Sequence, residues 1–269
     1  MNILMASILN TESDMNGVVV SIRELTERMR QNQHIVDIVT PYSTGRSAPL
    51  FRILRFFSTL FFRYQASVLT LINLTIKAIL IGAQVVNVRT QYTFFHAHDP
   101  ISAMVFLVLT DKSKVVLLQT HFFDSPWNEF VSAGFFKQSS LSSRLFEFFC
   151  KKVLSSSRLN LIPVSKANQR FVKSLVPEKK QTTNVLYPGL DIASPTPMPE
   201  KQNYLVNVGT LGPRKNQALL IHILAGLEKQ GLGLPLFLIG PINSVEKKHL
   251  LKLIKDLDIK SPVSFLGKR

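Results

Sequence analysis

The chain has 269 residues, of which 46% are hydrophobic and 18% are charged. Disordered chains combine low hydrophobicity with high net charge, so this composition excludes a largely disordered protein. The length predicts one large domain or two modest ones. The only cysteine, Cys150, excludes an intramolecular disulfide framework and a multi-cysteine zinc site, and it indicates a reducing compartment.

Basic residues outnumber acidic ones, with 32 Lys and Arg against 17 Asp and Glu and a formal net charge of +15. Such an excess favours anionic partners, which are phosphate-bearing ligands, anionic membrane surfaces or nucleic acid. The basic residues are spread along the chain, and no known nucleic-acid-binding motif occurs. We therefore expect no nucleic-acid partner.

Residues 52–64, from Arg52 to Tyr64, combine aromatic and basic side chains at helical spacing. An interfacial helix places its rings at the headgroup boundary and pairs its arginines with lipid phosphate. The segment therefore predicts contact with an anionic membrane surface. The alternative interpretation is a helix that packs on the core and carries a few solvated arginines.

The next stretch, residues 66–86, is apolar and about long enough to span a membrane, but Asn73, Lys77 and Gln84 interrupt it. A charge at the centre of a bilayer is costly, so we expect a buried or surface-lying helix instead. The first residues lack the basic start of a secretory signal. These features predict a cytoplasmic protein, with a peripheral position on the inner face of the plasma membrane as one alternative.

Strands and helices alternate through the first 190 residues. Residues 3–6 predict a strand, apolar residues at helical spacing over 18–29 predict a helix, and residues 35–39 predict the next strand. This βαβ unit implies a parallel sheet. The alternation continues with helical residues 51–82, extended 85–88, strand 92–97, helix 101–109, strand 114–121, helix 139–154, strand 159–164, helix 165–175 and strand 183–187. In the helix over 139–154, apolar residues gather near one side, at Leu141, Leu145, Phe148 and Phe149.

A change in composition separates this region from the rest of the chain. Pro195, Pro197 and Pro199 occur at alternate positions, which is typical of an extended and semi-rigid connector. We therefore expect domains over residues 1–190 and 203–269, joined by a linker over 191–202. The second domain repeats the α/β pattern, with strands over 204–209, 234–240 and 263–267 and helices over 216–229 and 245–257.

The first domain places candidate site residues after its strands. Asn16 and Gly17 lie where a loop meets a helix N-terminus, which is an anion site by geometry. His98 and Asp99 follow one strand, and His121 ends another with Asp124 nearby. Ligands of open parallel sheets bind beyond the carboxyl ends of the strands. His121 could act as a general base.

The histidine two residues before His98 allows two interpretations. His96 and His98 would point the same way on a strand, so a metal site is conceivable. We prefer the interpretation that His96 is a packed core residue and that only His98 reaches the crevice, because His96 lies within the strand.

The most specific local motif is the segment GTLGPRKN, residues 209–216. A strand ends at Gly209, a glycine-containing loop turns, and Arg214 and Lys215 stand at the start of the next helix. Cations are unfavourable at a helix N-terminus unless an anion binds there. Arginine offers a bidentate fork and lysine a point charge, so the pair indicates a diphosphate site. The alternative is a solvated basic turn.

Taken in chain order, these motifs resemble the group 1 glycosyltransferases of family four, whose GT-B architecture has two Rossmann-like domains. The resemblance runs along nearly the whole chain. Six motifs of the family have counterparts in this chain. They are the first glycine loop, the H-x-H motif at a strand end, the histidine that ends the next strand, the V-S-x-x motif, the N-G-V-D motif and the G-x-L-x-x-x-K loop. The matching segments here are GVVV, HAHD, QTH, VSKA, YPGLD and GTLGPRKN.

The resemblance implies an enzyme that transfers a sugar from a nucleotide-diphosphate donor to a polysaccharide or lipid-linked glycan. Transfer in this family usually retains the anomeric configuration and uses no bound metal or cofactor. Arg214 and Lys215, with Gly209, would bind the donor diphosphate. Gly17 would line the same crevice from the other domain. His121 and His98 would be the catalytic contacts to the reacting sugar or acceptor, and Asn16, Asp99 and Asp124 would line the crevice.

The chain also departs from the family pattern. After the linker its only glutamates are Glu200, Glu228 and Glu246, which do not form the family's E-x7-E motif, and Pro188 replaces the asparagine of N-G. The second domain has fewer predicted strands than a full donor domain. We therefore expect an incomplete donor domain. The alternative function is a catalytically incomplete remnant or an interaction subunit.

Overall fold

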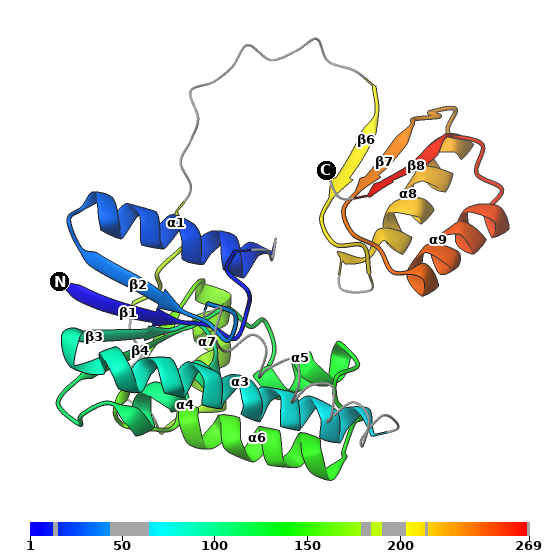
Figure 1. Ribbon diagram of the computed structural model, residues 1–269. Helices are drawn as coiled ribbons and strands as arrows, with labels where there is room; N and C mark the ends of the chain where they lie inside the picture. Colours follow the sequence, from blue (N-terminus) through cyan, green and yellow to red (C-terminus); the bar gives the residue numbers. More distant parts are fainter. Residues whose placement is uncertain (13–15, 44–64, 179–183, 190–202, 213–214, 268–269) are drawn as a thin grey trace. The chain divides into compact units, whose positions relative to one another are not determined.

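The computed structural model describes residues 1–12, 16–43, 65–178, 184–189, 203–212 and 215–267. The chain forms two compact units, Met1–Asp191 and Ile192–Arg269. Each unit is built on a parallel β-sheet with packed helices, which confirms the predicted α/β class (Figure 1). The predicted linker over 191–202 and the basic aromatic segment over 52–64 lie outside the described residues.

Strands and helices alternate in the first unit. In chain order they are β1 (Asn2–Ala6), α1 (Gly17–Gln31), β2 (Ile35–Val39), α3 (Ala66–Val88), the 3-10 helix η1 (Arg89–Gln91), β3 (Phe94–Ala97), α4 (Pro100–Leu109), β4 (Val115–Thr120), α5 (Pro126–Ser132), α6 (Leu141–Leu154), β5 (Leu159–Pro163) and α7 (Lys166–Leu175). The strands form one sheet in the order β2-β1-β3-β4-β5, and every pairing is parallel. Their carboxyl ends therefore meet at one edge of the sheet.

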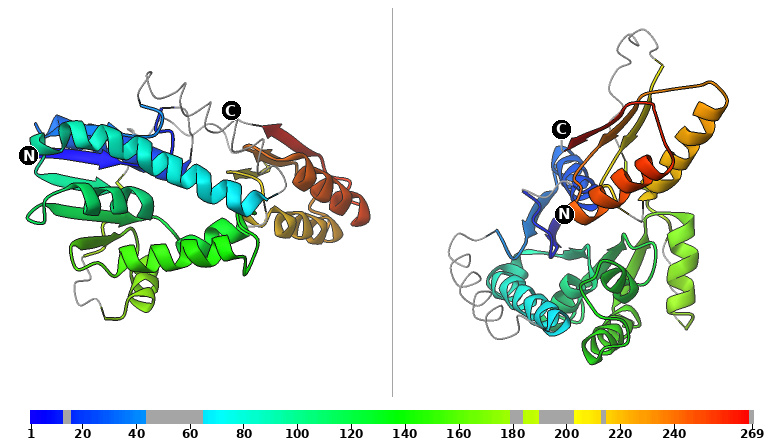
Figure 2. Two further views of the ribbon diagram at one scale, coloured as in Figure 1. Left: turned by 60° about the horizontal axis from the view of Figure 1, so that its bottom comes forward. Right: turned by 90° about the vertical axis from the view of Figure 1, so that its right-hand side faces the viewer.

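Different helices cover the two faces of this sheet (Figures 1 and 2). On one face, Ile3 and Met5 of β1 pack against Leu25 of α1. The other face carries the larger core, to which α3, α4 and α6 contribute. There Phe95 of β3 meets Phe106 of α4 edge-on, with ring centroids 5.2 Å apart. The sheet is thus packed against a hydrophobic core on each of its faces.

Helix α3 (Ala66–Val88) ends later than predicted. Residues Ala66–Gln91 are long and apolar enough to cross a membrane by length and composition, and 22% of their most apolar window is buried. The helix packs against α4 and α6 in the first unit. The extended region predicted over 85–88 is wrong, because α3 continues to Val88 and buries Val85 in the core. Packing here overrides the preference of β-branched residues for strands.

Two further segments of this unit differ from the predictions. The described residues 184–189 contain no strand, although Leu186 N–H donates to the Pro163 carbonyl over 2.9 Å. Pro188 has no N–H, so a ladder cannot continue through it. Helix α5 is absent from the predictions. It is short, and Ser125 caps it directly before Pro126 at its first position.

Helix α6 has two apolar sides. Phe146 and Cys150 face the core, and burial raises the pKa of the Cys150 thiol above its usual range. Leu141, Leu145 and Phe148 instead face solvent. The apolar side that the sequence groups together is therefore largely the exposed side of this helix.

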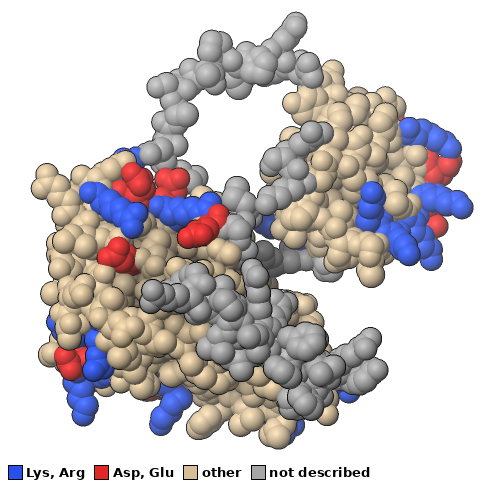
Figure 3. Space-filling model, viewed as in Figure 1, with Lys and Arg blue, Asp and Glu red and all other residues tan. Residues whose placement is uncertain are grey.

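The second unit is smaller. Its elements are β6 (Leu205–Val208), α8 (Gln217–Lys229), β7 (Leu236–Ile239), α9 (Ser244–Asp256) and β8 (Val263–Gly267). The sheet order is β6-β7-β8, again parallel. The described residues buried in its core are Leu211, Ile221, Leu224, Leu236, Leu238 and Leu250. Lysine side chains gather over the side of this unit where α9 lies (Figure 3).

We expect Phe106→Ala to lower the free energy of unfolding of the first unit by about 3–5 kcal/mol, because it leaves a cavity beside Phe95. Urea titration followed by fluorescence of Trp127, which belongs to the same core, measures the change. Val108→Ala on the same helix is the matched control. Its side chain is exposed, so we expect a change below about 0.5 kcal/mol. Equal losses in both variants would contradict the packing described above.

Candidate functional site

The connection after β1 opens helix α1 as an anion site would require. Asn16 is the N-cap, and its Oδ1 accepts a hydrogen bond from Val19 N–H over 3.0 Å. Gly17 is the first helical residue, and a Cβ added there would meet only open space. The backbone of the first turn is thus accessible, and the helix dipole favours an anion beside it. Contact of Asn16 and Gly17 with a ligand stays a prediction.

The backbone N–H and carbonyl of Ile8, at the start of this connection, are both held by side chains of other elements. The Asp99 carboxylate accepts from Ile8 N–H over 2.8 Å, and Lys77 Nζ of α3 donates to the Ile8 carbonyl over 3.2 Å. Asp99 also accepts from the N–H and the hydroxyl of Ser102, each over 2.8 Å, and so caps α4. These bonds fix where the β1–α1 connection leaves the sheet.

Asp99 therefore has a structural role in this connection, and its contact with a ligand stays a prediction. Burial raises the pKa of Asp99, while the hydrogen bonds from Ser102 and Ile8 and the charge of Lys77 act in the opposite direction. Its carboxylate oxygens are turned toward backbone and hydroxyl donors inside the unit. A role in placing the loop explains the interruption of the apolar helix by Lys77, which the sequence alone left without a reason.

Three histidines form a row at the carboxyl ends of β3 and β4. The ring centroids of His96 and His98 lie 4.4 Å apart, and those of His98 and His121 lie 5.5 Å apart. His98 Nδ1 and His121 Nε2 are within hydrogen-bond distance at 3.3 Å. His96 and His98 are both buried, whereas His121 is half-buried. The structure thus brings the two predicted histidines together, and His121 is the one that meets solvent.

The surroundings keep these imidazoles neutral. Burial lowers the pKa of His96 and of His121 from 6.5 to about 4, and it holds the pKa of His98 well below its usual value. A neutral imidazole can donate and accept hydrogen bonds, as contact with a sugar hydroxyl requires. A group with so low a pKa is a weak base at neutral pH. The row therefore suits binding and orientation better than proton abstraction.

Asp124 does not pair with this row. Its Oδ1 accepts from Ser125 N–H over 2.6 Å and from Asn128 Nδ2 over 3.2 Å, at the start of α5. Among the described residues, no hydrogen bond or ion pair joins Asp124 to His121. The residues that the structure describes contain no group of three or more His, Cys, Asp or Glu side chains that could hold a metal ion.

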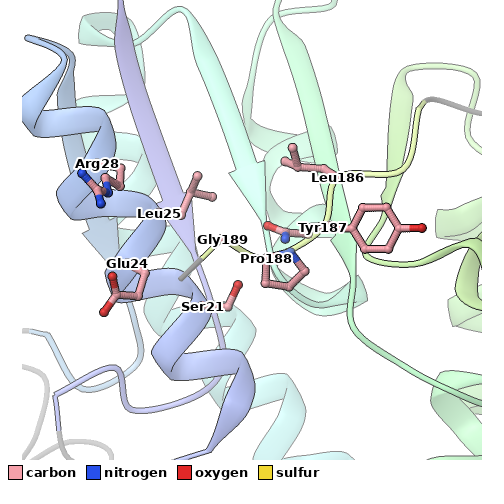
Figure 4. Close-up of a pocket in the computed structure, with 9 residues that line it drawn as sticks. Ser21, Glu24, Leu25, Arg28, Leu186, Tyr187, Pro188 and Gly189 are labelled. Atoms are coloured by element: carbon pink, nitrogen blue, oxygen red, sulfur yellow. The ribbon is translucent and has the colours of Figure 1, made fainter. Parts of the chain in front are cut away.

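Gln119 lies near the carboxyl end of β4, beside the histidine row, and was not among the predicted site residues. Its side-chain oxygen and the Nε2 atoms of His96 and His98 are buried without a hydrogen-bond partner. Gln119 also lines a cavity of about 240 Å³. Figure 4 shows Glu24 and Arg28 of α1 on one side of this cavity and the chain from Leu186 to Gly189 on the other. A glutamine inside an otherwise apolar strand was the available signal.

In the second unit, the loop after β6 brings Gly209 and Lys215 together. A Cβ added at Gly209 would lie 3.8 Å from Lys215 Cε, and Gly209 has a φ of +148°. Gly209 N–H donates to the Ile239 carbonyl over 2.8 Å. Lys215 stands two residues before the first residue of α8. Arg214, the other predicted diphosphate ligand, lies outside the described residues.

Two residues that the sequence analysis missed hold this loop in place. The buried side chain of Gln217 accepts from Gly212 N–H and donates to Asn207 Oδ1, each over 3.0 Å. Gly240 ends β7 with a φ of +142°, and a Cβ there would lie 1.9 Å from the Gly209 carbonyl oxygen. The two strand ends can therefore approach only with glycine at position 240.

These features define an α/β protein of two Rossmann-like units with a glycine-containing loop before a helix in each. The family model described as Glycosyltransferase Family 4 matches residues 15–194, and the model described as Glycosyl transferases group 1 matches residues 191–269. The first match alone covers more than half of the chain. The chain therefore belongs to glycosyltransferase family 4.

Solved structures with the same fold support the GT-B architecture. Anabaena Alr3699/HepE in complex with UDP and glucose is 18% identical with a TM-score of 0.63, and the match covers 100% of this chain and 70% of that one. The same protein in complex with UDP-glucose gives 17% identity, a TM-score of 0.64 and coverage of 100% and 69%. At this identity the likeness concerns the fold. No curated protein matches the chain.

We expect Gly240→Ala to disrupt the loop after β6, because a methyl group would collide with the Gly209 carbonyl. Backbone strain at this φ alone costs about 1–3 kcal/mol. Faster amide hydrogen exchange over residues 205–212 is the readout. Gly226→Ala within α8, where a Cβ meets nothing within 4 Å, is the matched control and should stabilise the unit by about 0.5–1 kcal/mol. Unchanged exchange in Gly240→Ala would contradict the close approach.

We expect acidification to destabilise the first unit through its buried histidines. As the pH falls from 6.5 to about 4, the unfolded chain binds a proton at His121 before the folded chain does. This difference costs up to about 3 kcal/mol by pH 4. In His121→Asn, the free energy of unfolding measured by urea titration should fall less steeply over this range. His249→Asn, at an exposed site on α9, is the control. An unchanged slope in His121→Asn would contradict the burial effect.

Proposed function

We propose that this glycosyltransferase transfers a sugar from a nucleotide-diphosphate donor to a hydroxyl of a polysaccharide or lipid-linked glycan, with retention of the anomeric configuration. Membership of family 4 supports sugar transfer. The complexes of HepE with UDP and UDP-glucose make UDP the first nucleotide to test.

The observation that carries the donor assignment is the position of Lys215 over Gly209. A flexible cation lies beside a glycine whose backbone a ligand can approach, close to the N-terminus of α8. Lys215 and Arg214 would neutralise the charge that develops on the diphosphate as the sugar leaves. Gln217 would keep the loop shaped for this task in the absence of ligand.

The first unit supplies the acceptor side of the proposal. His98 and His121 would contact hydroxyl groups of the acceptor or of the reacting sugar as neutral hydrogen-bonding groups. Asn16 and Gly17 would present the backbone of the first turn of α1 to an anionic group. Asp99 and Lys77 would act indirectly, because they hold the backbone N–H and carbonyl of Ile8, where the connection from β1 to α1 starts. No bound cofactor or metal takes part in this scheme.

We further propose a cytoplasmic enzyme that works at the inner face of the plasma membrane. Residues 52–64, with their arginines and aromatic rings, would contact anionic lipid and bring the site near a lipid-linked acceptor. The formal charge of +15 would strengthen that attraction at low salt.

The test is calorimetric titration of the chain with UDP and with GDP. We expect saturable binding of one nucleotide, and a loss of about tenfold or more in Lys215→Met, because a charge-assisted phosphate contact is worth about 1.5–3 kcal/mol. Lys229→Met, at the other end of α8, is the matched control and should bind as the original chain does. Transfer is then assayed as acceptor-dependent nucleotide release, with the product anomer read by NMR.

Two outcomes would contradict the proposal. Equal affinity in Lys215→Met and Lys229→Met would remove the donor site from this loop. No binding of either nucleotide by a folded chain would favour the alternative function, a catalytically incomplete remnant or interaction subunit.

A further inference from the structure

Helix α6 presents an apolar and basic surface to solvent. Leu141, Leu145 and Phe148 are 75%, 49% and 70% exposed. They recur at spacings of four and three residues and therefore lie on one side of the helix. Arg144 and Lys152 are exposed on the same side. We call these five residues the α6 face.

The position of α6 leaves this face open. The helix runs along the border of the helical layer of the first unit (Figures 1 and 2). Its opposite side already packs on the core through Phe146, Cys150 and Val153. The exposed leucines and phenylalanine are thus not required to fill the core, and large apolar side chains gathered on a surface typically mark an interaction site.

The charges on the α6 face are of one sign. Arg144 and Lys152 form no ion pair with any carboxylate that the structure describes, whereas Glu147 is paired with Lys151 over 2.7 Å. The chain as a whole carries a net charge of +15. Exposed leucine and phenylalanine beside unneutralised cations are complementary to a surface with acyl chains and phosphate groups.

An apolar cavity borders the same helix. Its volume is about 180 Å³, and it lies between α3, α4 and α6, with Leu74, Met104 and Phe149 among its lining residues. Phe149 is four residues after Leu145, so a residue that lines the cavity is a neighbour of the exposed leucine on the helix surface. An apolar cavity lined in part by the same helix suits hydrocarbon better than a polar partner.

We propose that the α6 face binds the surface of an anionic lipid bilayer, with Leu141, Leu145 and Phe148 inserted at the headgroup boundary and Arg144 and Lys152 on lipid phosphate. This contact is separate from the one proposed for residues 52–64, and it does not depend on sugar transfer. Vesicle binding in the absence of any nucleotide therefore tests it apart from the proposed function.

The first experiment reads the environment of position 148 directly. Trp127 is the only tryptophan, so the double variant Trp127→Phe, Phe148→Trp carries one fluorophore on the α6 face. We expect a blue shift of its emission, and quenching by brominated acyl chains, with vesicles of phosphatidylglycerol and phosphatidylcholine. The control is the double variant Trp127→Phe, Leu219→Trp, whose tryptophan lies on α8 and whose emission should not shift. Vesicle binding without a shift at position 148 would overturn the proposal, because another segment would then make the contact.

The second experiment measures affinity by vesicle sedimentation. Leu145→Asp, Phe148→Asp should lower the partition coefficient about tenfold or more, since it removes apolar burial and adds repulsion. Leu219→Asp, Ile223→Asp makes the same charge change at exposed positions of α8 and should bind as before. Binding should also fall with added salt and on vesicles of phosphatidylcholine alone. Equal binding by the two double variants would overturn the proposal. So would a dimer in solution that Leu145→Asp, Phe148→Asp abolishes, since the face would then join two copies.

Discussion

The site end of the first unit depends on how the backbone of Ile8 is held. Its N–H is bonded to the Asp99 carboxylate and its carbonyl to the Lys77 ammonium, so residues from β3–α4 and α3 fix the exit of β1. A buried carboxylate is costly unless donors surround it, and Asp99 has three such bonds. The cost of burying these charges is offset by bonds that place the N-terminus of α1 relative to the histidine row.

The same balance between burial and hydrogen bonding shapes the rest of the site. The histidine row lies at the strand ends, where burial favours neutral rings, and one contact joins His98 to His121. In the second unit, the neutral amide of Gln217 has the role that the charged Asp99 has in the first. It joins strand β6 to the loop that follows this strand. Both units thus hold a helix-opening loop through the hydrogen bonds of one side chain.

Much of the fold could be predicted from the sequence, because buried parallel strands read as short apolar runs and the helices between them keep their period. The histidines and the glycine loop could be found because polar residues end apolar strands. Long-range effects could not be read in this way. Val85 belongs to a helix through its packing, Asp99 points inward through Ile8 and Ser102, and Gly240 is required by the carbonyl of a strand distant in sequence. The period of α6 groups Leu141 with Phe148 but does not say which side faces the core.

The burial of Cys150 has a practical consequence for studying this enzyme. Its thiol is enclosed by the core on the inner side of α6, and its raised pKa keeps the reactive thiolate scarce. Maleimide reagents should therefore leave the native chain largely unmodified. Cysteines introduced on exposed positions, one in each unit, could then carry a pair of fluorescent dyes. Energy transfer between the dyes would follow the distance between the two units as nucleotide is added.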